Sequence, residues 1–166
     1  MALYALDPFL KELYQRHEEI ELQLVHERLS RVICEGVVSG KIDFGLVINP
    51  IRHTELVIVE LARDEVTFWR NSRSLPNVLL CNPDLLQTQS LLKKAKGINF
   101  KRTISSDSLE VLASLAKSNA GTAILPERIV KIIAPMFTKV EGASSFQDRL
   151  ALVYRSDLRK TAGAKV

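Results

Sequence analysis

In some segments of this chain, apolar residues recur with the period of a β-strand, and in others with the period of an α-helix. The two kinds of segment alternate along most of the chain. Residues 19–25 alternate strictly, with Ile20, Leu22 and Leu24 on one face and polar side chains on the other, which predicts a half-buried strand. The short apolar run at 78–81 predicts a buried strand. Strands separated by helices in this way are typical of an α/β fold with a parallel sheet.

The same reasoning gives an expected order of elements for the whole chain. Helices are expected at 7–16, 28–39, 82–96, 108–119 and 126–133, with a last helix opening at Asp157. The segments 56–61 and 66–69 predict two strands or one long bent strand. The other expected strands are 19–25, 43–50, 78–81, 100–104, 122–125 and 149–154.

Two of the expected helices carry signals at their first residues. Asp7 is suited to be the N-cap of the first helix, with Pro8 as its first helical residue. The segment 105–107 is expected to cap the helix at 108–119, with Glu110 as the partner in a capping box.

Composition excludes several classes of protein. Hydrophobic residues make up 46% of the 166 residues and charged residues 25%, which argues against disorder, a collagen-like repeat or a disulfide scaffold. No window approaches about 18 uninterrupted apolar residues, so neither a transmembrane helix nor a membrane partner is expected. The net charge of +4 is too mild to indicate nucleic-acid binding by itself.

The first residues do not predict a signal peptide. They lack a basic segment, and Asp7 and Pro8 interrupt the apolar run early. Secretion is therefore unsupported, and the expected location is the cytoplasm. Cys34 and Cys81 are far apart in the sequence and are expected to be free thiols there.

Motifs for catalysis, metals and cofactors are weak. His17, His26 and His53 have no partner at the spacing of metal ligands, and both cysteines lie in apolar patterns typical of packing residues. The sequence contains neither a nucleophile elbow nor a glycine-rich phosphate loop. We therefore expect no metal, no cofactor and no enzymatic activity.

Three polar clusters are candidates for ligand binding, and each has an ordinary alternative. The hydroxyl-rich segment 105–108 could bind an anion at a helix N-terminus, or it could simply cap the helix. Residues 87–90 could bind a ligand or form a solvated helix face. Asn49 and Pro50 follow a predicted strand, where ligands bind in open α/β sheets, but Asn-Pro is also a common turn. The basic run at 93–102 favours a solvated helix end over nucleic-acid contact.

Three segments, taken in order, resemble a known family. DPFLKELYQRHEEIELQLVHE is similar to its helix-then-strand run, and VICEGVVSGKIDFGLV to a segment that contains Gly40, Asp43 and Gly45. SSDSLEVLASLAKSNAGTAILPERIV is similar to its serine-capped helix, the glycine at Gly121, and an Ile-Leu-Pro sequence. Over nearly its whole length, the chain resembles the effector-binding (regulatory) domain of a LysR-type transcriptional regulator.

This resemblance implies a two-lobe type 2 periplasmic-binding-protein-like fold of the α/β class. Lobe I would comprise residues 1–62 plus 150–166, lobe II residues 63–149, and two crossing strands would join them. The family's DNA-binding domain and linker helix are absent from this sequence, so DNA would be contacted only through that missing N-terminal domain. The family's first effector-domain strand is also absent, and its loss would leave unpaired strand edges.

The resemblance further implies a small-molecule effector between the lobes, which shifts the population of lobe arrangements. Hydroxyl-rich helix ends would favour a carboxylate or a similar small polar anion, and Gly121 would permit a close approach of its backbone. The implied effector-binding residues are Ile48, Asn49, Thr88, Ser105, Ser106, Gly121 and Thr122.

The family's mode of association implies a homodimer, and a tetramer for the full-length protein. The dimer would pair segments 5–16 and 20–25 of one copy with 85–96 of the other. The alternative is that the apolar residues of these segments face their own lobe's core. The implied contact residues are Leu6, Leu10, Leu13, Leu91 and Leu92.

Three other functions remain open at this point. The first is a solute-binding protein of a transporter. The second is a prephenate-dehydratase-like enzyme on the same fold, which would need a Thr-Arg-Phe motif; the nearest segment, Lys101-Arg102-Thr103, is not one. The third is an interaction domain whose cleft is vestigial.

Overall fold

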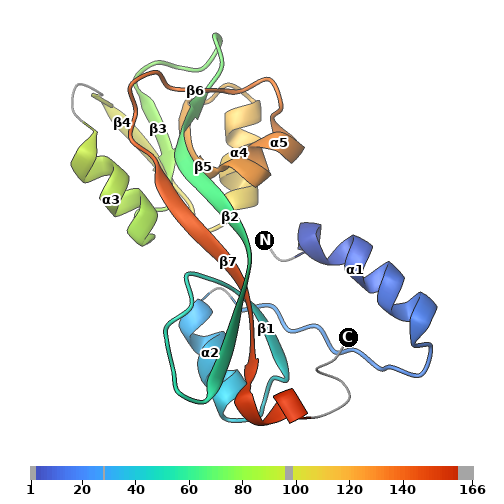
Figure 1. Ribbon diagram of the computed structural model, residues 1–166. Coiled ribbons are helices and arrows are strands. Elements are labelled where there is room, and N and C mark those ends of the chain that lie inside the picture. Colours follow the sequence, from blue (N-terminus) through green and yellow to red (C-terminus); the bar gives the residue numbers. More distant parts are fainter. Residues whose placement is uncertain (1–2, 28, 96–98, 161–166) are drawn as a thin grey trace. The chain divides into compact units, whose positions relative to one another are not determined.

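The computed structural model describes residues 3–27, 29–95 and 99–160 (Figure 1). Contacts divide the chain into two compact units, the first made of residues 1–62 and 149–166 and the second of 63–148. The helices are α1 (Leu3–Arg16), α2 (Ser30–Val38), α3 (Leu86–Lys94), α4 (Leu109–Lys117), α5 (Glu127–Ile133) and the 3-10 helix η1 (Ser156–Lys160). The strands are β1 (Phe44–Ile48), β2 (Leu56–Arg70), β3 (Val78–Cys81), β4 (Arg102–Ser105), β5 (Thr122–Pro126), β6 (Thr138–Lys139) and β7 (Phe146–Arg155).

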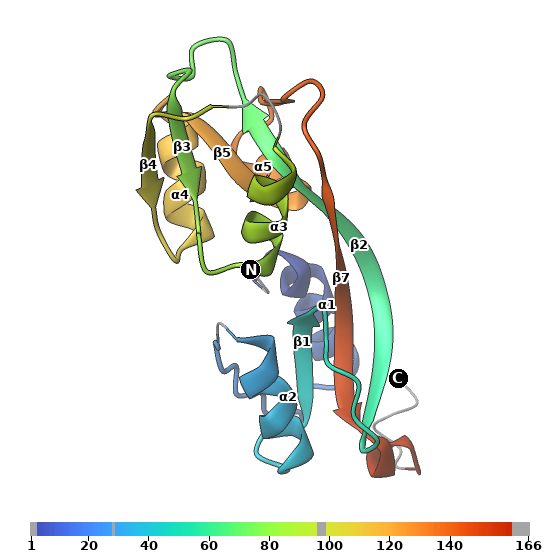
Figure 2. The same ribbon diagram turned by 90° about the vertical axis from the view of Figure 1, so that its left-hand side faces the viewer.

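The α/β class is confirmed, but the sheet is mixed rather than parallel throughout. Its strand order is β1-β7-β2-β5-β3-β4, and β6 pairs with β2. The parallel pairs are β3 with β4 and β3 with β5, whereas β1 with β7 and β2 with β5 are antiparallel. The two long strands β2 and β7 each run through a boundary between the units (Figure 2).

The core of the first unit lies between α2 and the pair β1–β7. Cys34 and Val37 of α2 pack against Val47 of β1 and against Ala151 and Val153 of β7. These strand residues are spaced two apart, so they share one face of the pair. The helix is therefore held by a single apolar stripe.

In the core of the second unit, both faces of β3 are covered by other elements. Leu79 and Cys81 belong to the cluster that includes Leu91 of α3. Because side chains alternate along a strand, Leu80 points to the opposite face, where α4 contacts β3. Burial on both faces explains why β3 is apolar throughout, and its bounds are those expected from the sequence.

The strand expected at 19–25 is absent from the described residues. These residues form neither helix nor strand, and Leu22, Leu24 and Val25 are 40%, 59% and 67% exposed. An alternating segment is stabilised as a strand only when another strand pairs with its backbone, and no described segment does so. The pattern alone was therefore insufficient, and this prediction was wrong.

Two further details differ from expectation, and one open alternative is resolved. Helix α1 begins at Leu3, so Asp7 is not its N-cap; Leu3, Ala5 and Leu6 are good helix formers that extend it. The N-cap of α4 is Ser108 rather than a residue of 105–107. Of the two alternatives for 56–69, the single long strand is correct, because β2 is continuous from Leu56 to Arg70.

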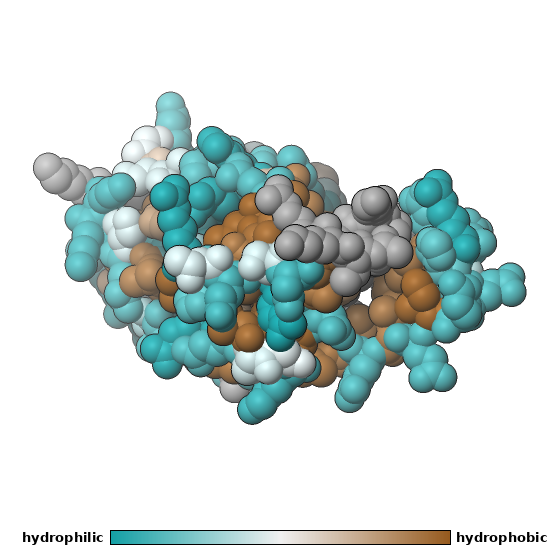
Figure 3. Space-filling view, turned by 60° about the horizontal axis from the view of Figure 1, so that its bottom comes forward, coloured by the Kyte–Doolittle hydropathy of each residue, from teal (hydrophilic) through white to brown (hydrophobic). Residues whose placement is uncertain are grey.

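Apolar side chains also reach the surface. Figure 3 shows them in brown on one face of the molecule, between hydrophilic residues. Those of the first unit that are about half exposed or more are Leu24, Val25, Leu29, Phe44, Ile51 and Leu61. None of the helices within the described residues is long and apolar enough to cross a membrane.

Candidate functional site

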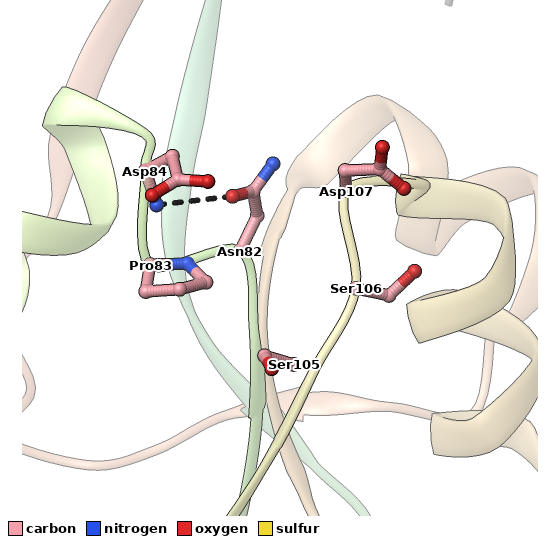
Figure 4. Close-up of a pocket in the computed structure, with 6 residues that line it drawn as sticks. All are labelled: Asn82, Pro83, Asp84, Ser105, Ser106 and Asp107. Atoms are coloured by element: carbon pink, nitrogen blue, oxygen red, sulfur yellow. Dashed lines mark hydrogen bonds between the residues drawn. The ribbon is translucent and has the colours of Figure 1, made fainter.

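A pocket lies where β3 and β4 end. The two strands are parallel neighbours, with Cys81 opposite Ser105, so their carboxyl ends meet at one edge of the sheet. The pocket has a volume of about 210 Å³ and belongs entirely to the second unit. Its lining consists of three residues that follow β3, the last residue of β4 and two residues from the β4–α4 connection: Asn82, Pro83, Asp84, Ser105, Ser106 and Asp107 (Figure 4).

Hydrogen bonds hold both walls of the pocket in place. The backbone N–H of Ser106 donates to the carbonyl of Cys81 over 3.3 Å, which ties the second wall to the end of β3. On the first wall, the backbone N–H of Asp84 donates to Oδ1 of Asn82 over 3.0 Å. The pocket is therefore built on strand ends rather than on a free loop.

The side chain of Asn82 lies in the first wall of the pocket. Its side chain is 7% exposed, and its Oδ1 accepts from Asp84, so the other amide atom is the Nδ2 donor. Figure 4 shows Nδ2 directed away from Asp84 and Pro83, toward the open space between the walls. An amide donor held in the wall of a pocket can bond to an acceptor atom of a ligand.

The N-terminus of α4, beside the pocket, is already capped. The hydroxyl of Ser108 accepts from the backbone N–H of Val111 and donates to the carboxylate of Glu110. Burial alone would raise the pKa of Glu110, but hydrogen bonds from its own backbone N–H and from Ser108 lower it below its usual value. The ionised Glu110 therefore occupies the place at which an anion would bind a helix N-terminus.

The structure brings together only two of the expected effector residues. Ser105 and Ser106 line the pocket side by side. Thr88, Gly121 and Thr122 belong to the same unit but are not among the described lining residues, and Thr88 and Thr122 are 1% and 3% exposed. Their hydroxyls are buried within the protein.

Gly121 makes a close approach to the protein's own backbone. A Cβ atom at this position would lie 2.5 Å from the carbonyl oxygen of Val78. The absence of a side chain thus allows β5 to begin beside β3, where Thr122 pairs with Leu79. In the structure, the close neighbour of Gly121 is therefore a strand of the same unit.

We expect Gly121→Ala to lower the free energy of unfolding by about 1–3 kcal/mol, because the new methyl group meets a fixed carbonyl rather than a flexible side chain. Urea unfolding followed by the fluorescence of Trp69, which lies in the same unit, measures the loss. Ser114→Ala on the exposed side of α4 serves as the control. Equal urea midpoints for the two variants would contradict the expected clash between the new methyl group and the carbonyl.

Ile48 and Asn49 lie in the first unit, at the end of β1. Asn49 has a positive φ of 51°, and its Oδ1 accepts from the backbone N–H of Arg149 over 2.9 Å. Its own N–H donates to the carbonyl of Arg149 over the same distance. The side chain of Asn49 thus continues the β1–β7 ladder by one step, which is a structural role.

The residues expected at a dimer contact differ in exposure. Leu91 is fully buried in the core of the second unit and is unavailable to a partner, whereas Leu92 is 39% exposed. Leu10 and Leu13 are half-buried in α1. The side chain of Leu6 lies outside the described residues.

The two cysteines are buried and free. Burial raises the pKa of the Cys34 thiol, partly offset by a hydrogen bond with the backbone of Ile51, and burial also raises the pKa of Cys81. Thiols with raised pKa values are poor nucleophiles at neutral pH. Within the described residues, no group of three or more histidine, cysteine, aspartate or glutamate side chains could hold a metal ion.

Asn82, Pro83 and Asp84 are lining residues that the sequence did not identify as a site. They were interpreted only as the start of a helix. The available signal was their position directly after a buried strand, where parallel strands place ligands. Without the knowledge that β3 and β4 are neighbours, this signal could not be joined to Ser105 and Ser106.

A comparison with family models assigns the chain. The model of the LysR substrate binding domain matches residues 1–166. The chain belongs to this family. A comparison with curated proteins finds no match.

Solved structures similar to this LysR substrate binding domain include regulatory domains and a full-length protein. The reduced OxyR regulatory domain from Pseudomonas aeruginosa has a TM-score of 0.73 at 13% identity, over 99% of this chain and 89% of that one. The CrgA regulatory domain from Neisseria meningitidis has a TM-score of 0.73 at 18% identity, with the same coverage. Full-length CbnR in complex with its target DNA has a TM-score of 0.66 at 17% identity, over 94% of this chain and 61% of that one.

These similarities confirm the periplasmic-binding-protein-like fold expected from the resemblance. They also confirm the expected family, the effector-binding domains of LysR-type transcriptional regulators. Because the structural neighbours are less than 25% identical, they support the fold alone and do not transfer any ligand to this chain.

Proposed function

We propose that this LysR substrate binding domain binds a small-molecule effector in the pocket formed by Asn82, Asp84, Ser105, Ser106 and their neighbours. The observation that carries the proposal is the position of this pocket at the carboxyl ends of two adjacent parallel strands, β3 and β4. Ligands of open α/β sheets bind at such ends. The family of the chain supports a sensing role for this position rather than a catalytic one.

The proposed lobes are residues 1–62 with 150–166 and residues 63–149. An effector acts on such a protein only to the extent that it binds one lobe arrangement more tightly than another. In this proposal the chain is a homodimeric sensor, tetrameric in the parent protein, which contacts DNA through a separate N-terminal domain. Leu92, Leu10 and Leu13 remain candidates for the dimer contact, because each is at least partly exposed.

A thermal-shift screen against small carboxylates, amino acids, amines and aromatic metabolites tests the proposal. A compound that binds only the folded state at about 100 times its Kd adds about 2.7 kcal/mol of stability, which raises Tm by roughly 5–10 °C in a chain of this size. In Ser106→Ala, we expect the affinity to fall about three- to tenfold, the effect of one hydrogen bond.

Ser118→Ala is the control, because Ser118 lies at the other end of α4 and its exposed hydroxyl donates to the Ser114 carbonyl. Each shift is measured against the same variant without ligand, so that changes in intrinsic stability cancel. A compound that stabilises Ser106→Ala and Ser118→Ala equally would bind elsewhere. The absence of any saturable shift across the panel would contradict the proposal.

A further inference from the structure

Basic residues gather where the parallel strands of the second unit begin. Val78 of β3 lies opposite Arg102 of β4, and Leu79 lies opposite Thr122 of β5, so the three strands start at the same edge of the sheet. This edge is at the top of Figures 1 and 2, and the pocket described above is at the other ends of β3 and β4. The basic side chains considered at this edge, named the basic end below, are Arg70, Arg73, Lys101, Arg102 and Lys117.

The loop 71–77, which carries Arg73, is bound to the start of β4. The carbonyl of Asn77 accepts hydrogen bonds from the backbone N–H groups of Lys101 and Arg102, over 2.9 Å and 3.1 Å. The loop and the start of β4 therefore form one connected piece of backbone.

The same loop is also bound to the segment that follows α4. The backbone N–H of Leu75 donates to the carbonyl of Asn119 over 3.2 Å, and Nδ2 of Asn71 donates to Oδ1 of Asn119 over 2.7 Å. Asn119 comes two residues after Lys117, the last residue of α4. Segments that are far apart in the sequence are thus fastened together at this end of the unit.

The charges of the basic end are not neutralised by neighbouring carboxylates. All five side chains are exposed, and none of them forms an ion pair with any other described residue. None of the acidic residues of the second unit belongs to the segments 70–77, 101–102 or 117–119. These acidic residues are Asp64, Glu65, Asp84, Asp107, Glu110, Glu127, Glu141 and Asp148.

The ordinary reason for a basic residue near a helix end accounts for only one of the five. Lys117 lies in the last turn of α4, where a cation complements the helix dipole. Arg70 and Arg102 belong to strands, and Arg73 and Lys101 belong to connections, so they have no such role. Because like charges repel one another in the folded state, the fold itself does not explain why they are grouped.

The form of this surface favours a duplex nucleic acid among possible anions. Its charges are spread over strand ends and connections, which suits a repeating anion better than a small one. Protein interfaces have an apolar centre, whereas Leu75 is the one exposed large apolar side chain of the segments 70–77, 101–102 and 117–119. These segments also contain no aromatic residue on which the bases of a single strand could stack.

We propose that the basic end binds the phosphate backbone of duplex DNA without sequence preference. DNA is the duplex considered because the chain belongs to a family of transcriptional regulators. The run 93–102 alone favoured a solvated helix end, but the topology adds Arg70, Arg73 and Lys117 from other parts of the chain. The proposal does not involve the pocket, so it is independent of effector binding.

Fluorescence anisotropy of a labelled duplex of about 20 base pairs, titrated with the whole chain, tests the proposal. We expect a Kd of about 1–100 µM near 0.1 M salt, the range of non-specific binding. If about four phosphates are contacted, the plot of log K against log salt concentration has a slope of about −3.6. Two duplexes of unrelated sequence are expected to give the same Kd.

Two variants locate the contact. Arg73→Gln and Arg102→Gln each remove one charge from an exposed side chain, so the fold is expected to persist. Each is expected to make the salt slope shallower by about 1 and to raise the Kd about five- to tenfold near 0.1 M salt, the effect of one phosphate contact. Lys41→Gln, which removes the same charge from an exposed site in the first unit, is the control and is expected to change the Kd less than about twofold.

Three results would each overturn the proposal. One is the absence of any anisotropy change with protein at about 100 µM near 0.05 M salt. Another is a Kd that responds to Lys41→Gln as much as to Arg73→Gln and Arg102→Gln, which would mean a general attraction to the whole chain. The last is binding of poly-L-glutamate as tight as that of the duplex at the same concentration of anionic groups, which would indicate an acidic protein as the partner. None of these results bears on the proposed function, which the thermal-shift screen tests separately.

Discussion

Replacement of Phe68 by alanine is expected to lower the free energy of unfolding by about 3–5 kcal/mol. Phe68 lies in β2, is 0% exposed, and packs with Leu79, Leu91 and Ile124 from β3, α3 and β5. Its ring also stacks on Phe100, with centroids 6.2 Å apart. Truncation removes these contacts and opens a cavity that the hydrogen-bonded strands around it fill only in part.

Urea unfolding followed by tryptophan fluorescence measures this loss. The chain has one tryptophan, Trp69, which is the sequence neighbour of Phe68 and is anchored by a bond from its Nε1 to the carbonyl of Leu125. The signal therefore reports on the second unit. Met136→Ala is the control, because Met136 is 83% exposed in that same unit and its truncation is expected to change stability by less than about 0.5 kcal/mol. Similar losses in the two variants would show that Phe68 is not central to the core.

The elements that the sequence predicted well are those whose burial is complete. The run 78–81 forms β3 with the expected bounds, because both of its faces are covered and every residue must be apolar. The segment 19–25 has a clearer alternation but forms no strand. Periodicity reports which side chains can share a face, but it does not report whether a neighbouring strand is present to pair with the backbone.

For the same reason, one wall of the candidate site could be predicted from the sequence and the other could not. Ser105 and Ser106 were identified from their own hydroxyls at a helix start, which is local information. Asn82 and Asp84 join them only because β3 and β4 are parallel neighbours, and this pairing is not written in either segment.

Removal of the Asp64 carboxylate is expected to destabilise the second unit by about 3 kcal/mol. Asp64 lies in β2, its side chain is 9% exposed, and it forms an ion pair with the guanidinium of Arg128. Its other oxygen accepts from the backbone N–H of Arg128 in the first turn of α5, over 3.3 Å. The N-cap residue of α5 is Pro126, whose side chain makes no capping bond, so Asp64 provides that acceptor from a different element.

Breaking a buried ion pair by removing one partner costs about 3–5 kcal/mol, since the other charge is left uncompensated. The side chain of Arg128 is 25% exposed, so water compensates part of its charge, which places the effect of Asp64→Ala at the lower end of that range. Asp64→Asn keeps an oxygen for the helix N–H and loses the charge, and it is expected to lose less. The difference between the stability losses of the two variants separates the contribution of the hydrogen-bond acceptor from that of the ion pair.

A double-mutant cycle with Arg128→Ala gives the coupling directly, measured as above through the fluorescence of Trp69. We expect a coupling free energy of about 1–3 kcal/mol, because the two side chains are in contact. Purely additive losses would mean that Asp64 and Arg128 act independently. In that case the stability of α5 would rest on its packing against α4 and β5 rather than on the carboxylate beneath its first turn.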